Sequence, residues 1–148
     1  MKVFMSGVML VVMSISLYFS NALQPEVVND ALGEVQIVVI DEKGNEVIHD
    51  SLTFTEDDTL LSLLESHYEV TTQKGFTQLP DSTVILGIND VQTNFESTFI
   101  RILVDGYLYD RNGDLVEKVN HISVVGIDML PLIDGNTYTF EYASVNGR

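Results

Sequence analysis

The stretch TEDDTLLSLLESHYEV, residues 55–70, predicts one short helix in a chain that otherwise reads mostly as strands. Thr55 and Asp58, three residues apart, resemble a capping box with Asp in place of the usual Glu or Gln. Positions i, i+3, i+4 and i+7 then form one stripe: Leu60, Leu63, Leu64 and His67. A helix this short is not stable alone in water, so we expect its leucines to pack on a sheet. The histidine is expected at the edge of the core or as the cation at the helix C-terminus.

Residues on both sides of this helix read as strands. Before it, VQIVVI (35–40) is apolar on both faces, as in a central strand, and a turn at 41–45 joins it to 46–54 in a predicted hairpin. After it, strand-like segments recur at 84–90, 99–110 and 133–145. This order predicts an α+β fold in which a mostly antiparallel sheet packs on the one short helix.

The later segments carry more specific predictions. Asp105-Gly106 is a tight-turn signal, so we expect residues 99–104 to form one strand and YLY (107–109) to lead back from it. The closing segment places three aromatic residues on one face, which predicts that they are buried: Tyr138, Phe140 and Tyr142. Residues 115–132 match no single pattern.

The composition excludes several classes of protein. The chain has 22 acidic and 7 basic residues and a net charge of −15. Phosphate backbones and anionic lipid surfaces repel such a protein, so we expect no nucleic-acid partner. The absence of cysteine excludes disulfides, thiolate metal sites and a lipidated N-terminal cysteine.

The N-terminus predicts secretion. An apolar run from Val3 to Phe19 follows one lysine, and the small residues Ser20 and Ala22 suit cleavage after Ala22. We therefore expect a signal peptide at 1–22 and a secreted or extracellular mature chain. The alternative is an uncleaved leader that tethers the protein, with no other contact with a membrane. The polar residues 23–33 are expected to form a spacer.

Four segments together resemble a family of secreted bacterial domains of unknown function that is similar to the C-terminal domain of transcobalamin. The segments are TLLSLLESHYEV, VILGINDV, RILVDGYLY and GIDMLPLIDGNTYTFEY. Residues 104–106 stand at the family's Val-Asn-Gly turn, and residues 132–136 stand at its last turn. The resemblance covers residues 34–143 and leaves a short tail at 144–148.

The resemblance implies a β-grasp-like fold and a corrinoid or another small ligand bound during uptake at the cell surface. Two features depart from the family pattern. Phe99 and Arg101 lie where the family often has Trp or Tyr, and this chain has no Trp. Compared with the family pattern, residues 114–125 (DLVEKVNHISVV) read as an insertion before the Gly-Ile pair.

The residues offer little for catalysis and a weak pattern for calcium. There is no G-x-S-x-G motif and the three histidines lie in unrelated segments, so no enzyme is expected. Asp110, Asn112 and Asp114 have the spacing of the first three oxygen ligands of a calcium loop, and Glu117 is a candidate for a later ligand. The alternative is a hairpin turn at RNGD (111–114) that needs no ion.

A polar ligand has its own candidate residues. Tyr107 and Tyr109 lie near a turn and, with Arg101, suit a binding surface, although the tyrosines equally suit cross-strand packing. Phe99 and Asn89 complete the candidate set within the resembling segments.

These observations predict a secreted, non-catalytic binding module. A cobalamin-like compound or another small molecule is the first candidate ligand. One alternative is a protein-interaction or adhesion module that presents an exposed strand edge to a cell-surface protein. The other is an extracellular domain stabilised by calcium.

Overall fold

The computed structural model describes residues 30–75 and 81–147. The predicted signal peptide lies outside the described residues, as does most of the predicted spacer. Within the described ranges, no helix is both long enough and apolar enough to cross a lipid bilayer.

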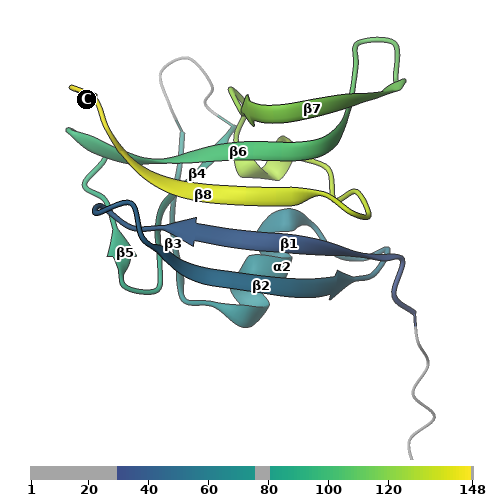
Figure 1. Cartoon of the computed structure of the whole chain (residues 1–148), viewed down its shortest axis with the longest axis horizontal. Coiled ribbons are helices and arrows are strands. Elements are labelled where there is room, and N and C mark those ends of the chain that lie inside the picture. Colours follow the sequence, from purple (N-terminus) through teal and green to yellow (C-terminus); the bar gives the residue numbers. More distant parts are fainter. Residues whose placement is uncertain (1–29, 76–80, 148) are drawn as a thin grey trace, which may run out of the picture.

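A mixed five-stranded sheet forms the main layer (Figure 1). In spatial order its strands are β2 (Glu46–Phe54), β1 (Gly33–Ile40), β8 (Thr137–Ser144), β6 (Thr98–Tyr109) and β7 (Leu115–Ile122). The two central strands, β1 and β8, are parallel, and the other neighbours are antiparallel. The edges of the sheet are therefore β2 and β7.

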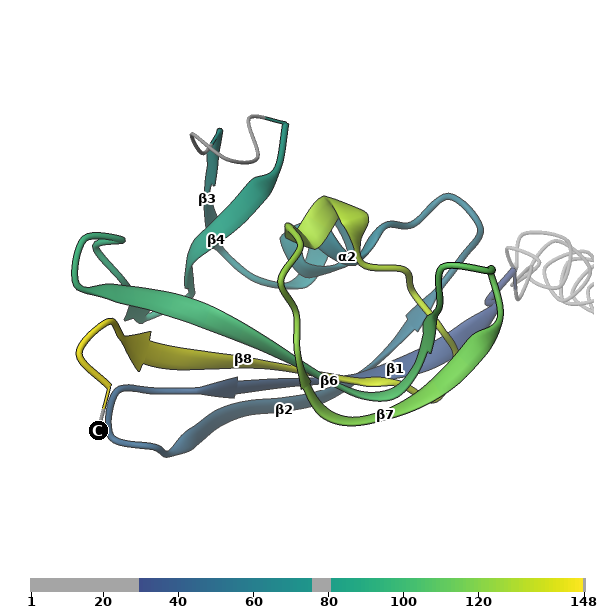
Figure 2. The same cartoon turned by 90° about the horizontal axis from the view of Figure 1, so that it is seen from above.

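A second, three-stranded antiparallel sheet lies on one side of the main sheet. It consists of β3 (Val70–Lys74), β4 (Thr83–Ile88) and β5 (Val91–Gln92). Figure 2 shows this small sheet on the same side of the main sheet as α2 (Leu60–His67) and the 3-10 helix η1 (Ile127–Met129).

The expectation of an α+β, β-grasp-like fold is wrong. Strands hold 51% of the described residues and helices only 10%, and the strands are divided between two sheets. The physical reason lies in β3 and β5, which lie outside the strand-like segments recognised in the sequence. β3 and β5 pair with β4 rather than with the main sheet, and β4 buries Ile85 and Ile88 against the core.

The first hairpin is confirmed. β1 and β2 pair antiparallel, with Val35 opposite Leu52 and Val39 opposite Ile48. β1 is central, and its apolar residues are buried on both faces of the sheet: Val35, Ile37, Val38 and Val39. Burial on both faces is the physical reason that apolar residues run without a break from Ile37 to Ile40.

The helix packs as predicted but begins later. Leu60, Leu63 and Leu64 are buried against the main sheet. The capping box is formed by Thr59 and Ser62, each of which accepts the backbone N–H of the other (3.1 and 2.9 Å). A helix that begins at Leu60 places all three leucines on the buried face within its first two turns.

The predicted capping box at the start of the stretch is therefore wrong. The N–H and hydroxyl of Thr55 donate to the Asp58 carboxylate at 2.8 and 3.1 Å, which closes a turn ahead of the helix. At the other end, His67 lies in the last turn, with its Nδ1 3.0 Å from the carbonyl oxygen of Leu63. The expected position of His67 at the helix C-terminus is confirmed.

The tight turn predicted at Asp105-Gly106 is also wrong, because β6 continues through it to Tyr109. Gly106 has φ +130°, and a Cβ there would lie 2.1 Å from Oδ1 of Asn136. Asn136 is fully buried. Its Oδ1 accepts the N–H of Tyr107 at 2.7 Å, and its Nδ2 donates to the Tyr107 carbonyl at 2.8 Å. The glycine is needed for this close approach rather than for a reversal of the chain.

The segment that matched no single pattern forms β7 and η1. The β6–β7 turn lies at residues 110–114, as the Asn-Gly signal predicted. The register between β6 and β7 shifts at Asn120, which has φ +48° and donates its N–H to the Asp105 carboxylate at 2.6 Å. This bulge in β7 is stabilised by a side chain from β6.

The closing strand is confirmed. On β8, Tyr138 and Phe140 are fully buried and Tyr142 is partly buried against the same core. The Tyr138 hydroxyl donates to the carbonyl of Pro131, and burial raises its pKa. The aromatic face therefore packs in the same core as the leucines of α2.

Candidate functional site

The larger of the two described hollows lies where two turns meet at one end of the main sheet. The turn between β1 and β2 forms one wall, the turn between β4 and β5 forms the other, and a tyrosine of β8 lies between them. The hollow has a volume of about 390 Å³ and is open to solvent on one side. We call it the two-turn cleft, and its main lining residues are Glu42, Ile48, Asn89, Asp90, Val91 and Tyr142.

The β1–β2 wall is held by one carboxylate. Asp41 accepts the backbone N–H groups of Lys43 (2.9 Å) and Asn45 (2.8 Å), and it also accepts the side-chain amide of Asn45 (3.2 Å). The hydrogen bond from the Asn45 backbone is the main reason that the pKa of Asp41 lies below its usual value. Asp41 is therefore ionised at neutral pH, and its oxygens already have partners within the turn.

The β4–β5 wall is built around Asn89, one of the predicted ligand-binding residues. Asn89 has φ +49°, a region that asparagine tolerates better than most residues. Its backbone N–H donates to the Glu69 carbonyl (2.8 Å), and its Oδ1 accepts the Glu69 N–H (2.9 Å). Gln92 donates to the Asn89 carbonyl at 2.8 Å. Asn89 thus lines the cleft, with its amide nitrogen unpaired among the described residues.

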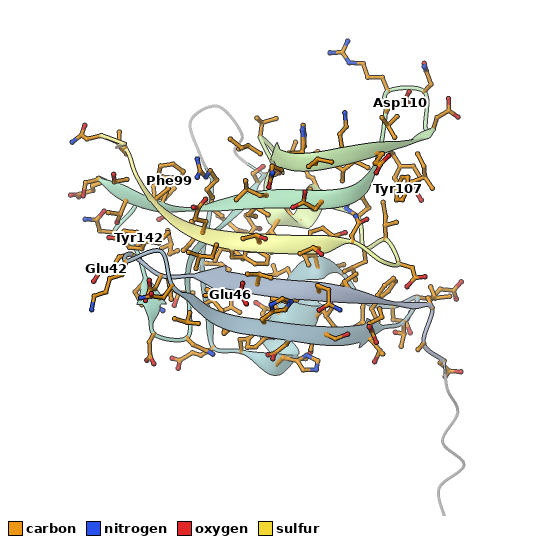
Figure 3. The ribbon with its side chains drawn as sticks, in the orientation of Figure 1. Glu42, Glu46, Phe99, Tyr107, Asp110 and Tyr142 are labelled. Carbon is orange, nitrogen blue, oxygen red and sulfur yellow. The ribbon has the colours of Figure 1, made fainter. Side chains whose placement is uncertain are left out.

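The interior of the cleft is apolar and its rim is acidic. Val47, Ile48 and Val91 supply its accessible apolar surface. The carboxylates of Glu42 and Asp90 have no hydrogen-bond or ion-pair partner within the described ranges. The same holds for the hydroxyl of Tyr142, so all three groups are available to a ligand. Figure 3 shows Glu42 and Tyr142 at the same end of the sheet.

The second hollow contains two other predicted ligand-binding residues. It has a volume of about 260 Å³, and Phe99 and Arg101 contribute to its lining beside residues 122–127. The guanidinium of Arg101 is bound to Glu141 on the neighbouring strand, with Nε 3.0 Å from Oε2. Its charge is therefore already paired, and it offers less to an anionic or polar ligand than the sequence suggested.

Tyr107 and Tyr109 lie at the far end of the same strand. They are 46% and 57% exposed. Tyr107 lies six positions after Arg101 on β6, a distance of about 20 Å at the usual rise per residue of a strand. Figure 3 likewise shows Phe99 and Tyr107 toward opposite ends of β6. The five predicted ligand-binding residues therefore fall in three separate places.

The predicted calcium loop is a hairpin turn in this structure. Asp110 Oδ1 accepts the backbone N–H groups of Asn112 (2.7 Å) and Asp114 (3.0 Å), and these bonds lower the pKa of Asp110. Glu117 lies on β7 beyond the turn, opposite Tyr107. Across residues 30–75 and 81–147, no group of three or more His, Asp and Glu side chains is placed to hold a metal ion.

Sequence reasoning missed most of the two-turn cleft. Glu42 and Asp90 lie in turns whose acidic residues also suit plain turn chemistry. Tyr142 was expected only as part of the buried aromatic face. The three come from turns and strands far apart in the sequence, so no spacing could have connected them.

Comparison with known proteins adds little. No family model matches the chain, and no curated protein matches it. Among solved structures, it is similar to the crystal structure of a "putative metal binding protein" from Ruminococcus gnavus ATCC 29149, with a TM-score of 0.49 and 18% sequence identity. The match covers 76% of this chain and 97% of that chain.

Proposed function

We propose that the chain is an extracellular, non-catalytic binding module that holds a small organic cation in the two-turn cleft. The observation that carries this proposal is the cleft itself, a concave site with an apolar interior and unpaired polar groups on its rim. Its volume of about 390 Å³ falls within the usual range of small-molecule sites, about 300–1,000 Å³.

The charge of the rim selects the class of ligand. Asp41, Glu42 and Asp90 bring three carboxylates to the cleft, against the single ammonium of Lys43. A net charge of −15 adds a field that attracts cations from solution. An amine with an apolar body fits both properties, because its ammonium can reach Glu42 or Asp90 while its body lies on Ile48 and Val91.

The preformed walls favour ligand binding. The hydrogen bonds of Asp41 and Asn89 hold both turns before any ligand arrives, so little ordering is needed on binding. The leader expected at residues 1–22 supports a place outside the cell, where such a module can capture a solute for uptake.

The test is a titration of the purified protein with 2-phenylethylamine and with its neutral analogue 2-phenylethanol. We expect the amine to bind more tightly, and to shift the NMR signals of Asn89, Asp90 and Tyr142. Removal of two rim charges in Glu42→Gln/Asp90→Asn should weaken amine binding about tenfold. The matched control, Glu56→Gln/Glu96→Gln, changes the net charge equally at exposed sites outside the cleft and should leave the affinity unchanged.

Three results would contradict the proposal. The first is an equal loss of affinity in the two double variants, which would mean that the overall charge of the protein, and not the rim carboxylates, attracts the amine. The second is equal binding of the amine and the alcohol. The third is a shift in melting temperature with cobinamide or cobalamin but not with amines, which would favour the corrinoid that the transcobalamin resemblance implies.

A further inference from the structure

The outer edge of β7 has no strand beside it among the described residues. β7 is the last strand of the main sheet, and its only strand partner in the described ranges is β6 (Figure 1). An unpaired strand edge presents backbone donors and acceptors that another extended chain can bind. This edge lies at the opposite end of the strand order from β2.

The hairpin register shows which backbone groups are free. The N–H of Asp110 donates to the carbonyl of Asp114 at 2.8 Å, so the backbone groups of Asp114 point toward β6. Hydrogen-bonding direction alternates along a strand, so Val116 and Lys118 also point toward β6. Leu115 and Glu117, which lie in between, therefore point their N–H and C=O groups to the free edge, and Val119 continues this alternation directly after Lys118.

The side chains of the same three residues lie on the outer face of the sheet. Leu115 and Val119 are 53% and 72% exposed, and they lie on either side of the carboxylate of Glu117. Tyr109 is opposite Leu115 on β6, and Tyr107 is opposite Glu117. The free edge is thus bordered by a patch of two tyrosines and two aliphatic residues, a composition typical of protein-binding surfaces.

The length of the usable edge is limited on both sides. The β6–β7 turn ends at Asp114, and the bulge at Asn120 breaks the regular register. Four residues, 115–118, are in regular antiparallel pairing with β6, and Val119 follows them at the start of the bulge. A partner strand therefore has three positions that face Leu115, Glu117 and Val119 directly.

We propose that β7 residues 115–119 bind an extended peptide with a lysine or arginine opposite Glu117 and apolar residues opposite Leu115 and Val119. Residues directly opposite one another in a sheet lie on the same face, so each of these pairs is in contact. The motif is apolar-x-basic-x-apolar, which reads the same in both directions and suits a parallel or an antiparallel partner. The acidic chain favours such a basic segment over a second copy of itself, which carries the same charge of −15.

The test uses two synthetic peptides that differ at one position. Thr-Val-Thr-Lys-Thr-Val-Thr has the proposed motif, and Thr-Val-Thr-Glu-Thr-Val-Thr reverses its charge. We expect the wild-type protein to bind the lysine peptide at least tenfold more tightly by calorimetry. The bound peptide should slow amide hydrogen exchange at Leu115, Glu117 and Val119.

Two charge variants of β7 decide the specificity. Glu117→Lys should reverse the preference, so that the glutamate peptide binds more tightly. Lys118→Glu is the matched control, because the side chain of Lys118 lies on the other face of the strand and its reversal should leave the preference unchanged. Circular dichroism spectra and melting curves show whether both variants remain folded.

The competing occupant is a second copy of the chain. A dimer in sedimentation experiments that protects the same three amides would overturn the proposal. So would equal affinity for the two peptides, or slowed exchange at other residues only. None of these outcomes depends on the two-turn cleft, because the cleft is lined by the β1–β2 turn, the β4–β5 turn and Tyr142.

Discussion

The β1–β2 and β6–β7 hairpins have the same turn structure, but the strands that they place at the two edges of the main sheet expose different side chains. In both, an aspartate accepts backbone N–H groups from residues two and four positions later. In both, a glycine with positive φ lies three positions after that aspartate, Gly44 at +80° and Gly113 at +86°. A local pattern of one aspartate and one glycine therefore produces the same chain reversal in two different surroundings.

The outer strands of these hairpins differ in what they expose. β2 presents mostly polar side chains to solvent, and its one exposed large hydrophobic residue is Val47. β7 exposes Leu115, Val119 and Ile122 over a similar length. The polar edge resists pairing with other chains and the apolar edge permits it. Turn chemistry thus determines where a hairpin reverses, while its exposed side chains determine what its edge can bind.

The two hairpins are also attached to the sheet in different ways. Asp134 accepts the N–H of Glu34 in β1 at 2.8 Å from an exposed position. Asn136, two residues later, is fully buried and binds both backbone groups of Tyr107 in β6. The side chains of one turn therefore hold the first hairpin through a solvated bond and the second through buried ones.

Asn136→Ala should have the largest effect on stability. It leaves the N–H and carbonyl of Tyr107 without their partner, at a cost of about 2–3 kcal/mol in the free energy of unfolding. Asp134→Ala, the matched change on the same turn, should cost about 1 kcal/mol or less because water can replace its bond. Urea unfolding measures both. Equal losses in the free energy of unfolding would show that the buried hydrogen bonds of Asn136 contribute no more than the solvated bond of Asp134.

Asp41→Ala and Asp110→Ala should have intermediate effects that depend on pH. The folded-state pKa of each carboxyl lies below its usual value of 3.8, because backbone N–H groups bind the charged form. Each carboxylate therefore stabilises the fold above about pH 4, and this contribution is lost as the pH falls through the lowered pKa. The gap in melting temperature to the wild type should shrink from pH 7 to pH 3.

The two pH profiles should match, since the two turns share their hydrogen bonds. Asp114→Ala is the control, because no partner of its carboxylate lies within the described residues, and it should show little change with pH. A gap that persists at pH 3 in either aspartate variant would mean that the turn is held by something other than carboxylate charge.

The ion pair between Arg101 and Glu141 should have the smallest effect. Its side chains are 36% and 28% exposed, so water screens their attraction. A double-mutant cycle with Arg101→Met and Glu141→Gln should give a coupling of about 0.5 kcal/mol. A coupling several times larger would mean that water screens the ion pair less than its exposure indicates. The pair would then resemble the buried hydrogen bonds of Asn136 in strength.

Local sequence patterns predicted a good part of the fold. The β1–β2 hairpin, the leucine stripe of α2 and the aromatic face of β8 follow from the periodicity of apolar residues, which reflects burial on one or both faces. The division of the strands into two sheets does not follow from periodicity. β4 has the same apolar character as a strand of the main sheet, and only its pairing with β3 and β5 removes it from that sheet.

The candidate sites were harder to predict than the fold. Asn89, a candidate ligand-binding residue from the sequence, lines a cleft, but the other groups of that cleft are Asp90, Glu42 and Tyr142 from separate turns and strands. Tyr107 and Arg101 were expected together and lie about 20 Å apart along β6. Sequence proximity on a strand does not bring side chains together, since an extended chain moves them steadily apart.

The sequence by itself determined the turns at Asp41 and Asp110, the burial of the helix leucines and the acidic charge, because each depends on a residue and its near neighbours. The tertiary structure alone decided the conformation of Asp105-Gly106, which has a turn signal and yet lies inside strand β6. There the side chain of Asn136 binds across the glycine and favours continued pairing over a reversal. The tertiary structure also decided the position of the free β7 edge, because a strand becomes an edge only when the rest of the sheet has formed.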